Sequence, residues 1–418
     1  MSKRWIQFGS AVVAMIMIAN LQYSWTLFVR PIQDANHWKL SDIQEAFALF
    51  LFFETWITPV EGWLIDRLGP RLFLSVGGIL VGIGWTGLGF IHSLNQLYVL
   101  YSVAGVGAAF VYSGSIATAL KWFPDKRGTV SGFITAGFGA GAALFIPFIA
   151  HLIRTTNYQT AFVYTGITQG IAIFVAAQCL KNPGPEFTSK AARKEPSPRI
   201  RRTKKQLNSL QMLSTPLFYL LYATFVLISV GGLMLTAQSA LVADSFKISA
   251  AALTAAVAAS RLANGGGRIF WGWLSDYTGR EMAMLVPFAL QAVSLLLMLN
   301  VGRVSGLWFT ISLCAVFFIW GSMFSLFPAI IGDYFGADHA TSNYGFLYTA
   351  KGVATWGGAW IAARVFEKSG SWDSVFYGSA ALALISCILV LIVRVMPLPG
   401  VGADEPRMVA ASAEVEIG

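Results

Sequence analysis

Twelve long apolar segments constrain this chain more than any other feature of its sequence. Each is near or above the ~20 residues that a helix needs to cross the hydrocarbon core of a membrane. The segments span residues 5–29, 43–65, 71–91, 95–120, 127–153, 160–180, 214–241, 249–274, 281–302, 306–332, 340–366 and 372–395. Their frequent glycine and proline residues are typical of membrane helices. The pattern predicts an all-α membrane protein with twelve transmembrane helices.

The composition of the 418-residue chain agrees with a membrane location. Apolar side chains make up 56% of the residues and the mean hydropathy is +0.63. Only 12% of the residues are charged, about half the roughly 25% of a typical soluble domain. So few charged side chains cannot cover a soluble fold, which argues against a cytosolic enzyme, a disordered protein and a nucleic-acid-binding protein. The net charge of +9 is mostly local, because residues 181–205 hold nine Lys or Arg and two Glu.

The distribution of basic residues predicts the orientation of the helices. With the N-terminus inside, the inside segments hold about 19 of the 29 Lys and Arg residues, and the outside loops about seven. Because basic residues favour the cytoplasmic side, we expect both termini in the cytoplasm and the protein in the inner (plasma) membrane of the cell. The expected parts are an N-terminal six-helix half, a basic linker, a C-terminal six-helix half and a disordered cytoplasmic tail. They span residues 1–181, 182–213, 214–396 and 397–418. We expect the linker cations to lie on anionic lipid headgroups.

The two halves repeat a short loop. GWLIDRLGPR at 62–71 follows the second segment, and GWLSDYTGR at 272–280 follows the eighth, an offset of 210 residues. A weaker pair, WFPDKRG at 122–128 and YFGADHATSNYG at 334–345, has an offset of about 212. Two similar six-helix units indicate a transporter with a central cavity between them.

This loop, present twice in the pattern G-x-x-x-D-R/x-x-G-x-R, resembles the signature of the major facilitator superfamily. The resemblance implies twelve helices in two pseudo-repeated halves that rock around a central cavity, which is transport by alternating access. The charged residues of the two loops are expected to latch the halves together at the inside end, with ordinary loop structure as the alternative. These residues are Asp66, Arg67, Arg71, Asp276 and Arg280.

Four ionisable residues lie deep in apolar segments, where charge is costly and marks a functional hypothesis. From the helical rise, Arg268 lies roughly 12 Å, Lys351 roughly 16 Å and Glu54 roughly 18 Å from an inside helix end. Arg261 lies seven residues before Arg268 on the same helix face, nearer the outside. A guanidinium can bind one carboxylate through two parallel hydrogen bonds, and an ammonium can bind the other end of a small dianion. One acid cannot neutralise two or three cations, so an anionic ligand is favoured over cations that only hold helices together.

Around these charges the sequence resembles a narrower group, the oxalate/formate antiporter family. The resemblance rests on QYSWTL at 22–27, VY with WFPDKRG and SGF at 111–133, NGGGR with FWG and SD at 264–276, and NYGF with AK at 343–351. In that family, the positions of Arg268 and Lys351 bind substrate carboxylates inside a box of aromatic side chains. The family therefore implies small carboxylates as substrates: oxalate, formate or a monocarboxylate. The binding residues that it implies here are Gln22, Tyr23, Tyr112, Arg268, Trp320 and Lys351.

The chain also departs from the oxalate-carrying members of that family. They have tyrosine where this chain has Phe138 and Phe324, and tryptophan where it has Tyr348. The two missing hydroxyls would serve a small polar dianion, whereas a ligand with an apolar part would tolerate phenyl rings better. Tyr348 shares a helix face with Lys351 and is a further binding candidate, with helix packing as its alternative.

Glu54 allows two mechanisms. Its depth is similar to that of Lys351, so the two side chains are expected to meet across the interface between the halves. Glu54 could be a fixed counter-ion in an anion exchanger, or a proton site in a proton-coupled symporter for monocarboxylates such as lactate or pyruvate. Glu54 and Arg261 are the candidate pair of residues for coupling or for the interface between the halves. For Glu54, the alternative is a salt bridge at that interface with no further role.

Other function classes have little support in the sequence. No H-E-x-x-H pair, P-loop or G-x-S-x-G string lies in a helix or at its end, and the four histidines fall at loops and helix ends. We therefore expect a carrier rather than an enzyme or sensor, with no metal, no cofactor and no nucleic acid. Its expected partners are the carboxylate substrate and the lipid bilayer, and its expected oligomeric state is a monomer.

Overall fold

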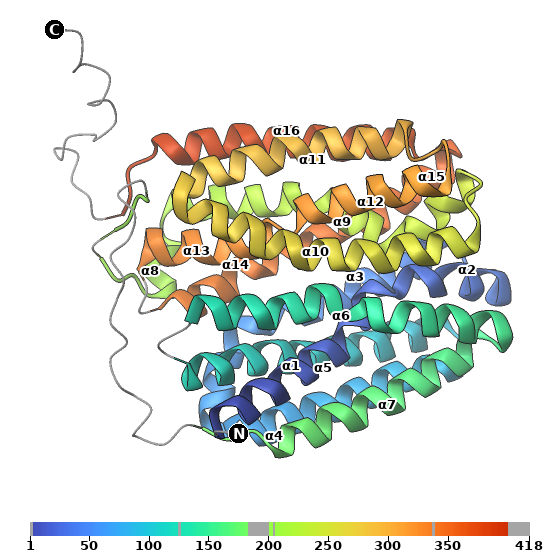
Figure 1. Ribbon diagram of the computed structural model, residues 1–418, viewed down its shortest axis with the longest axis horizontal. Coiled ribbons are helices and arrows are strands. Elements are labelled where there is room, and N and C mark those ends of the chain that lie inside the picture. The colour runs from blue at the N-terminus through green and yellow to red at the C-terminus, as the bar shows by residue number, and fades with distance from the viewer. Residues whose placement is uncertain (1–2, 124–126, 183–199, 204, 337–338, 400–418) are drawn as a thin grey trace, which may run out of the picture.

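The computed structural model describes residues 3–123, 127–182, 200–203, 205–336 and 339–399. Helices make up nearly all of this described part, and it contains no strand. Figure 1 shows the long helices lying roughly side by side in two groups, one from each half of the chain. The sequence-based prediction of an all-α fold in two halves is confirmed.

The helices of the N-terminal half cover most of residues 3–178. They are α1 (Lys3–Tyr23), α2 (Trp25–Asn36), α3 (Leu40–Trp56), α4 (Thr58–Gly87), the short η1 (Leu88–Phe90), α5 (Leu94–Trp122), α6 (Arg127–Thr155) and α7 (Tyr158–Gln178).

The helices of the C-terminal half follow the short α8 (Ser209–Leu213). They are α9 (Pro216–Ser245), α10 (Ala250–Thr278), α11 (Arg280–Asn300), α12 (Gly306–Trp320), α13 (Met323–Phe335), α14 (Ala340–Thr355), the π-helical turn η3 (Trp356–Ile361), α15 (Ala362–Ser369) and α16 (Asp373–Val395).

Four of the predicted segments are interrupted, and Ile57, between α3 and α4, breaks the segment 43–65. Ser24 separates α1 from α2, and its hydroxyl donates to the Asn20 carbonyl at 2.6 Å, a local bond that bends helices. Gly321 and Ser322 separate α12 from α13, and η3 lies between α14 and α15. Such breaks place the ends of helices, with their side chains, inside the bundle.

The repeated loop has the same backbone conformation in both halves. Gly69 has φ 74° and ψ 158°, and marks a break inside α4. Gly279, at the matching position of the second copy, has φ 87° and ψ 156° and separates α10 from α11. Glycine is the residue that adopts such positive φ values without steric cost. The repeat read from the sequence is therefore also a repeat of backbone geometry.

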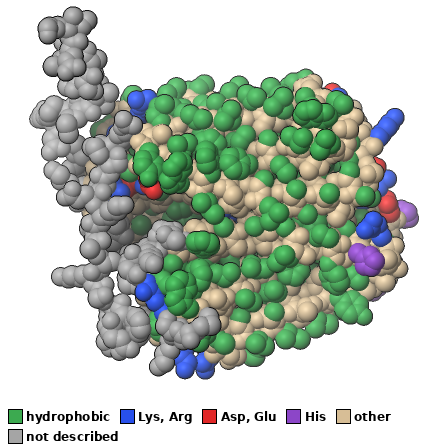
Figure 2. Space-filling view, in the orientation of Figure 1, with side chains coloured by type: hydrophobic (Ala, Val, Ile, Leu, Met, Phe, Trp, Pro, Cys, Tyr) green, Lys and Arg blue, Asp and Glu red, His purple; other side chains and the backbone are tan. Residues whose placement is uncertain are grey.

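Nine helical stretches within the described residues are long and apolar enough to cross a membrane. The predicted segments outside this set are 43–65, 249–274 and 340–366, which hold Glu54, Arg261 with Arg268, and Lys351. Figure 2 shows apolar side chains spread over the long sides of the visible face, with charged side chains and histidines near its two ends. The three segments that are too short or too polar to count as simple spans are thus the ones that carry Glu54, Arg261, Arg268 and Lys351.

Helices α10 and α12 approach one another through glycine. A Cβ atom on Gly267 would lie 2.0 Å from the Phe318 carbonyl oxygen, and one on Gly321 would lie 2.6 Å from the Asn264 carbonyl oxygen. No larger residue fits at either position, so the two backbones are in direct contact. This contact holds Arg268 beside the break between α12 and α13.

The two ends of the bundle differ in how the halves are joined. We call the end that holds α8 and the N-terminus the linker end, and the opposite end the far end (Figure 1). The described hydrogen bonds between the halves lie at the bundle centre and at the far end. The far-end bonds join Ser41 N to Glu367 Oε1 (2.9 Å), Gln44 Nε2 to the Ala237 carbonyl (3.1 Å) and Ala240 N to Thr26 Oγ1 (2.8 Å). The halves are therefore closed against each other at the far end.

The described part of the linker contacts the C-terminal half. Arg201 NH1 lies 3.2 Å from Glu281 Oε1, and Arg202 Nε lies 2.7 Å from Asp333 Oδ1. The expectation that the linker cations lie on lipid headgroups is wrong for these two residues, because carboxylates of α11 and α13 bind them. Residues 183–199, 204 and 400–418 lie outside the described part, so the predictions for them stay predictions.

Candidate functional site

Lys351 on α14 is bound by three oxygen atoms at the centre of the bundle. Its side chain has 0% exposure. The Nζ atom donates to Gln22 Oε1 at 2.9 Å, to Glu54 Oε2 at 3.0 Å and to the Tyr348 hydroxyl at 3.1 Å. These contacts occupy all three ammonium donors. They also join α14 of the C-terminal half to α1 and α3 of the N-terminal half.

Arg268 on α10 is bound by neutral groups alone within the described part of the chain. It is 3% exposed. Its Nε donates to Asn264 Oδ1 at 3.2 Å, its NH1 to the Thr135 carbonyl at 3.1 Å, and its NH2 to the Tyr23 hydroxyl at 3.1 Å. A buried cation held only by neutral oxygens keeps its net charge, so the guanidinium can still bind an anion.

Both cations face the same two phenyl rings. Arg268 Cζ lies 4.2 Å from the Phe324 ring centroid and 5.9 Å from that of Phe138. Lys351 Nζ lies 5.9 Å and 5.7 Å from the same two centroids. The two charges therefore lie against the same pair of phenyl rings.

The remaining predicted binding residues pack behind these rings. Tyr112 on α5 stacks on Tyr348 with 5.7 Å between ring centroids and meets Phe138 edge-on at 5.3 Å. Trp320, at the end of α12, meets Phe324 edge-on at 4.9 Å, and its buried indole N–H has no hydrogen-bond partner among the described residues. The structure thus brings Gln22, Tyr23 and Tyr348 into hydrogen-bond contact with the cations and puts Tyr112 and Trp320 one layer further out.

Gly139 on α6 leaves the room that the arginine head group occupies. A Cβ atom there would lie 3.0 Å from both Arg268 Nε and Asn264 Oδ1. Such a contact is tight enough to force the guanidinium to move. The absence of a side chain at position 139 therefore helps set the position of the arginine.

Arg261 and Glu54 do not form the pair that was expected of them. Glu54 binds Lys351, whereas Arg261 lies against the aromatic rings of Phe317 and Tyr23. The reason is geometric, because Arg261 lies two helical turns before Arg268, toward the far end.

A second buried carboxyl group lies on α4. Glu61 is 1% exposed, and neither of its oxygens has a hydrogen-bond partner in the described part of the chain. Its position is seven residues beyond Glu54, toward the linker end. No described cation pairs with it, so it does not neutralise the charges at Arg268 and Lys351.

The described loop ion pairs lie within one half. Arg280 Nε is 2.8 Å from Asp333 Oδ2, and Arg280 NH1 is 2.8 Å from Asp276 Oδ1. These pairs join α10, α11 and α13 of the C-terminal half and do not latch it to the N-terminal half. Arg71 is exposed, and the side chains of Asp66 and Arg67 lie outside the described residues.

Sequence reasoning did not identify two of the groups that bind Arg268. Asn264 lies four residues before Arg268, and that i, i+4 spacing on one helix is a signal that could have indicated the contact. Thr135 contributes its main-chain carbonyl from α6, which no side-chain pattern reveals. Phe138 and Phe324 were noted only as departures from the oxalate carriers, and their contact with both cations comes from the fold.

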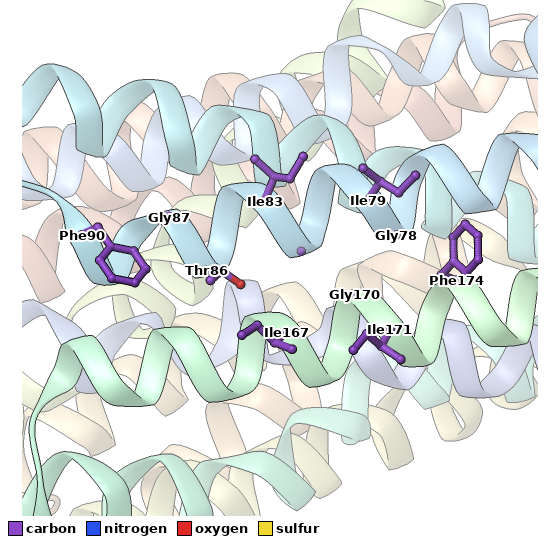
Figure 3. A pocket seen from close by; sticks show the side chains of 11 residues that line it. Gly78, Ile79, Ile83, Thr86, Gly87, Phe90, Ile167, Gly170, Ile171 and Phe174 are labelled. Atoms are coloured by element: carbon purple, nitrogen blue, oxygen red, sulfur yellow. The ribbon is translucent and has the colours of Figure 1, made fainter.

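A different cavity, of about 570 Å³, lies between α4 and α7. Figure 3 shows isoleucine and phenylalanine side chains along it, among them Ile79, Ile83 and Phe174. Thr86 is the one lining residue with a polar side chain, and the lining contains no cation. This cavity lacks the groups that bind an anion, so the cation pair Arg268 and Lys351 is the candidate site for one.

Comparisons with known proteins agree with the fold. The chain matches the family model of the Major Facilitator Superfamily over residues 10–355 and 220–414. It is 36% identical to the oxalate:formate antiporter of Oxalobacter formigenes over 99% of this chain and 96% of that protein. It is 25% identical to apicoplast pyruvate carrier 1 of Toxoplasma gondii over 75% of this chain and 68% of the carrier. It is 27% identical to human monocarboxylate transporter 2 over 48% of this chain and 44% of the transporter.

These similarities extend over the whole described bundle and include both halves. The family match covers most of the chain, and a relative with 36% identity aligns with nearly all of it. Together with the helical architecture, they show that this multi-pass membrane protein belongs to the Major Facilitator Superfamily.

Proposed function

We propose that this protein is a secondary carrier that exchanges small carboxylate anions, of the oxalate and formate type, across a membrane. The observation that carries the proposal is the pair of buried cations Arg268 and Lys351, which face the same two phenyl rings. Its similarity to the oxalate:formate antiporter of Oxalobacter formigenes supports the same substrate class.

The charge balance of the site favours an anionic ligand. Arg261, Arg268 and Lys351 are buried cations, and Glu54 is the one described carboxylate that pairs with any of them. Buried charge without a partner of opposite sign is costly. A bound dianion would neutralise the excess and a bound monoanion would halve it.

The geometry suggests how a carboxylate binds. One carboxylate group replaces the Tyr23 hydroxyl on Arg268, whose guanidinium then donates two parallel hydrogen bonds to it. The other end of a dianion binds Lys351, which keeps its bonds to Gln22 and Tyr348. Because Tyr23 and Glu54 belong to the N-terminal half and both cations to the C-terminal half, the bound anion replaces two contacts between the halves.

Exchange follows from the cost of moving the empty carrier. When no anion is bound, closing both ends of the cavity buries unbalanced positive charge, which raises the free energy of the closed form. A bound anion lowers that barrier. Each passage across the membrane therefore needs a substrate, and inward transport of one anion is coupled to outward transport of another.

A second candidate is proton-coupled symport of a monocarboxylate, with Glu54 as the proton site. The phenyl rings of Phe138 and Phe324 favour it, because they suit a substrate with an apolar part. The bond between Glu54 and Lys351 favours exchange instead, because a carboxylate that pairs with an ammonium at 3.0 Å suits the role of a fixed counter-ion. The variant Glu54→Gln distinguishes the two mechanisms. If the protein is a symporter, uptake by the variant no longer responds to the pH gradient. If it is an exchanger, the pH gradient has no effect on uptake before or after the substitution.

We further propose that the linker end, with both termini, faces the cytoplasm, and that the carrier works as a monomer in the inner (plasma) membrane. The excess of basic residues at that end supports this orientation. The N-terminal half, the linker, the C-terminal half and the tail keep the proposed bounds 1–181, 182–213, 214–396 and 397–418.

The experiment is uptake of labelled oxalate into proteoliposomes loaded with oxalate, formate, lactate or buffer alone, with and without a pH gradient. If the protein is an exchanger, uptake requires internal oxalate or formate and does not depend on the pH gradient. Lack of oxalate uptake under every condition, with lactate or pyruvate uptake driven by the gradient, would contradict exchange and support the second candidate.

A further inference from the structure

Arg261 is a buried cation that the substrate site described above does not use. Its side chain has no exposed surface and packs against the Phe317 ring, with Cζ 3.7 Å from the centroid. Its Nε makes one long bond, 3.4 Å, to the Val257 carbonyl of its own helix. Its NH1 has no hydrogen-bond partner among the described residues. A guanidinium offers five donors, so this one is poorly satisfied and keeps donors that an anion could use.

The position of Arg261 relates it to Arg268. Seven residues separate the two on α10, so they lie on one face of the helix about 10 Å apart along its axis. Tyr23 contacts both: its hydroxyl accepts from Arg268, and its ring lies 4.7 Å from Arg261 Cζ. The two guanidinium groups therefore form a line from the central site toward the far end, with one tyrosine beside both.

The contact between Arg261 and Tyr23 crosses from one half to the other. The far end is closed by hydrogen bonds that join the halves there, one of which ends on Glu367. Glu367 also lines a cleft of about 270 Å³ between α2, α9 and α15 at the far end. If the halves separate from this cleft inward, Tyr23 moves away from Arg261 and uncovers one side of its guanidinium. A solute that enters from the far side would then reach Arg261 before it reaches Arg268.

We propose that Arg261 is a second carboxylate-binding residue, which captures the substrate from the far side and passes it to Arg268 and Lys351. This inference rests on the proposed transport of small carboxylates. The planar guanidinium can bind a carboxylate through two parallel hydrogen bonds, while the Phe317 ring supports its other side. As the far end closes, the Tyr23 ring covers Arg261 again and the carboxylate remains at the central pair.

The test compares the two faces of the carrier in proteoliposomes with a single orientation. Half-saturation for labelled oxalate is measured at the far side and at the linker side for the wild type, Arg261→Gln and Arg261→Lys. We expect Arg261→Gln to raise the far-side value about tenfold or more, as the loss of a charge-assisted hydrogen bond would, and to leave the linker-side value unchanged. Arg261→Lys keeps the charge without the planar fork, so a smaller rise is expected.

A matched control removes a different arginine from the same end. Arg303 also lies over a phenyl ring, with Cζ 4.9 Å from the Phe246 centroid, but it is exposed and paired with Asp373. Arg303→Gln is expected to change neither half-saturation value, which separates binding at Arg261 from a general loss of positive charge at the far end.

Three results would overturn the inference. Equal half-saturation values for Arg261→Gln and wild type at the far side would exclude binding there. A far-side rise matched by a linker-side fall, or the reverse, would show that the substitution only shifts the balance between the two conformations. If Arg261→Gln does not fold, Arg261→Lys with wild-type values at both faces would exclude a role for the guanidinium. Absence of carboxylate exchange by the wild type would instead contradict the proposed function itself.

Discussion

Lys351 Nζ lies 3.0 Å from Glu54 Oε2, and both side chains are buried where the two halves of the bundle meet. The pair joins α14 to α3 and ties one half to the other at the depth of the substrate site. Because the lysine has a counter-ion and the nearby arginine has none among the described residues, the two cations have different tasks. Arg268 supplies the uncompensated charge, and Lys351 supplies a second contact whose strength Glu54 limits.

Glu54→Gln is expected to lower the stability of the carrier. Removing one partner of a buried ion pair leaves the other charge uncompensated, which costs about 3–5 kcal/mol. The measurement is thermal unfolding of the purified protein in detergent, with and without oxalate. We expect a lower Tm and a larger rise on adding oxalate than the wild type shows, because the anion takes over the role of the lost carboxylate.

The double variant Glu54→Gln with Lys351→Met is the control for that experiment. It removes both charges, so most of the lost stability should return. A single Glu54→Gln variant as stable as the wild type would contradict the importance of the pair.

A second prediction concerns how the two cations share the substrate. In the double variant Glu54→Gln with Lys351→Gln, the ammonium is absent and no unpaired carboxylate remains. Oxalate should lose the contact at its second end, whereas formate needs only Arg268. We expect the half-saturation of oxalate to rise about tenfold more than that of formate in competition assays. Equal losses for the two substrates would exclude this division.

A third prediction uses a glycine next to the arginine. Gly139→Ala places a methyl group 3.0 Å from Arg268 Nε and Asn264 Oδ1, so the guanidinium has to shift. A displacement of about 1 Å at a binding group can reduce transport as much as a hundredfold. We expect exchange to fall at least tenfold while the Tm of the protein stays close to that of the wild type.

Gly137→Ala is the matched control on the same helix. Its Cβ atom would lie 3.7 Å from its nearest neighbour, Ile16, which is an ordinary contact. Exchange by this variant should equal that of the wild type. If both alanine variants lose transport to the same degree, the effect belongs to α6 as a helix and not to the arginine.

A fourth prediction addresses the choice of substrate. Phe138 and Phe324 border the space between the cations with apolar rings. Phe138→Tyr combined with Phe324→Tyr adds two hydroxyl donors there, each of which contributes about 1 kcal/mol to a hydrogen-bonded ligand. The ratio of oxalate to lactate uptake should increase at least fivefold. An unchanged ratio would mean that these rings do not set the preference.

Much of the fold could be predicted from the sequence because its signals are local. Hydropathy located the helices, and the repeated loop motif indicated two similar units, which share a positive φ at Gly69 and Gly279. The breaks inside helices were less accessible. Ser24 carries no proline-like signal, and its effect depends on a bond to the Asn20 carbonyl that forms only once the helix exists.

The candidate site was accessible only in part, for a related reason. Counting residues along a helix gave the depth of Arg268, Lys351 and Glu54, and intramembrane charge is rare enough to attract attention. One contact between distant helices, that of Glu54 with Lys351, was expected from their similar depth and is present in the structure, whereas other such contacts were not accessible. The bond of Arg280 to Asp333, 53 residues later, is one example. The sequence predicted that Arg280 helps to latch the two halves together, whereas in the structure it joins helices of the C-terminal half.

The central claim is that Arg268 binds the carboxylate whose exchange this carrier performs. The most direct measurement is uptake of labelled oxalate into oxalate-loaded proteoliposomes that contain the wild type, Arg268→Gln or Arg303→Gln at equal amounts. The account predicts rapid exchange by the wild type and by Arg303→Gln, and exchange at the level of empty vesicles by Arg268→Gln. Wild-type rates from Arg268→Gln would contradict it.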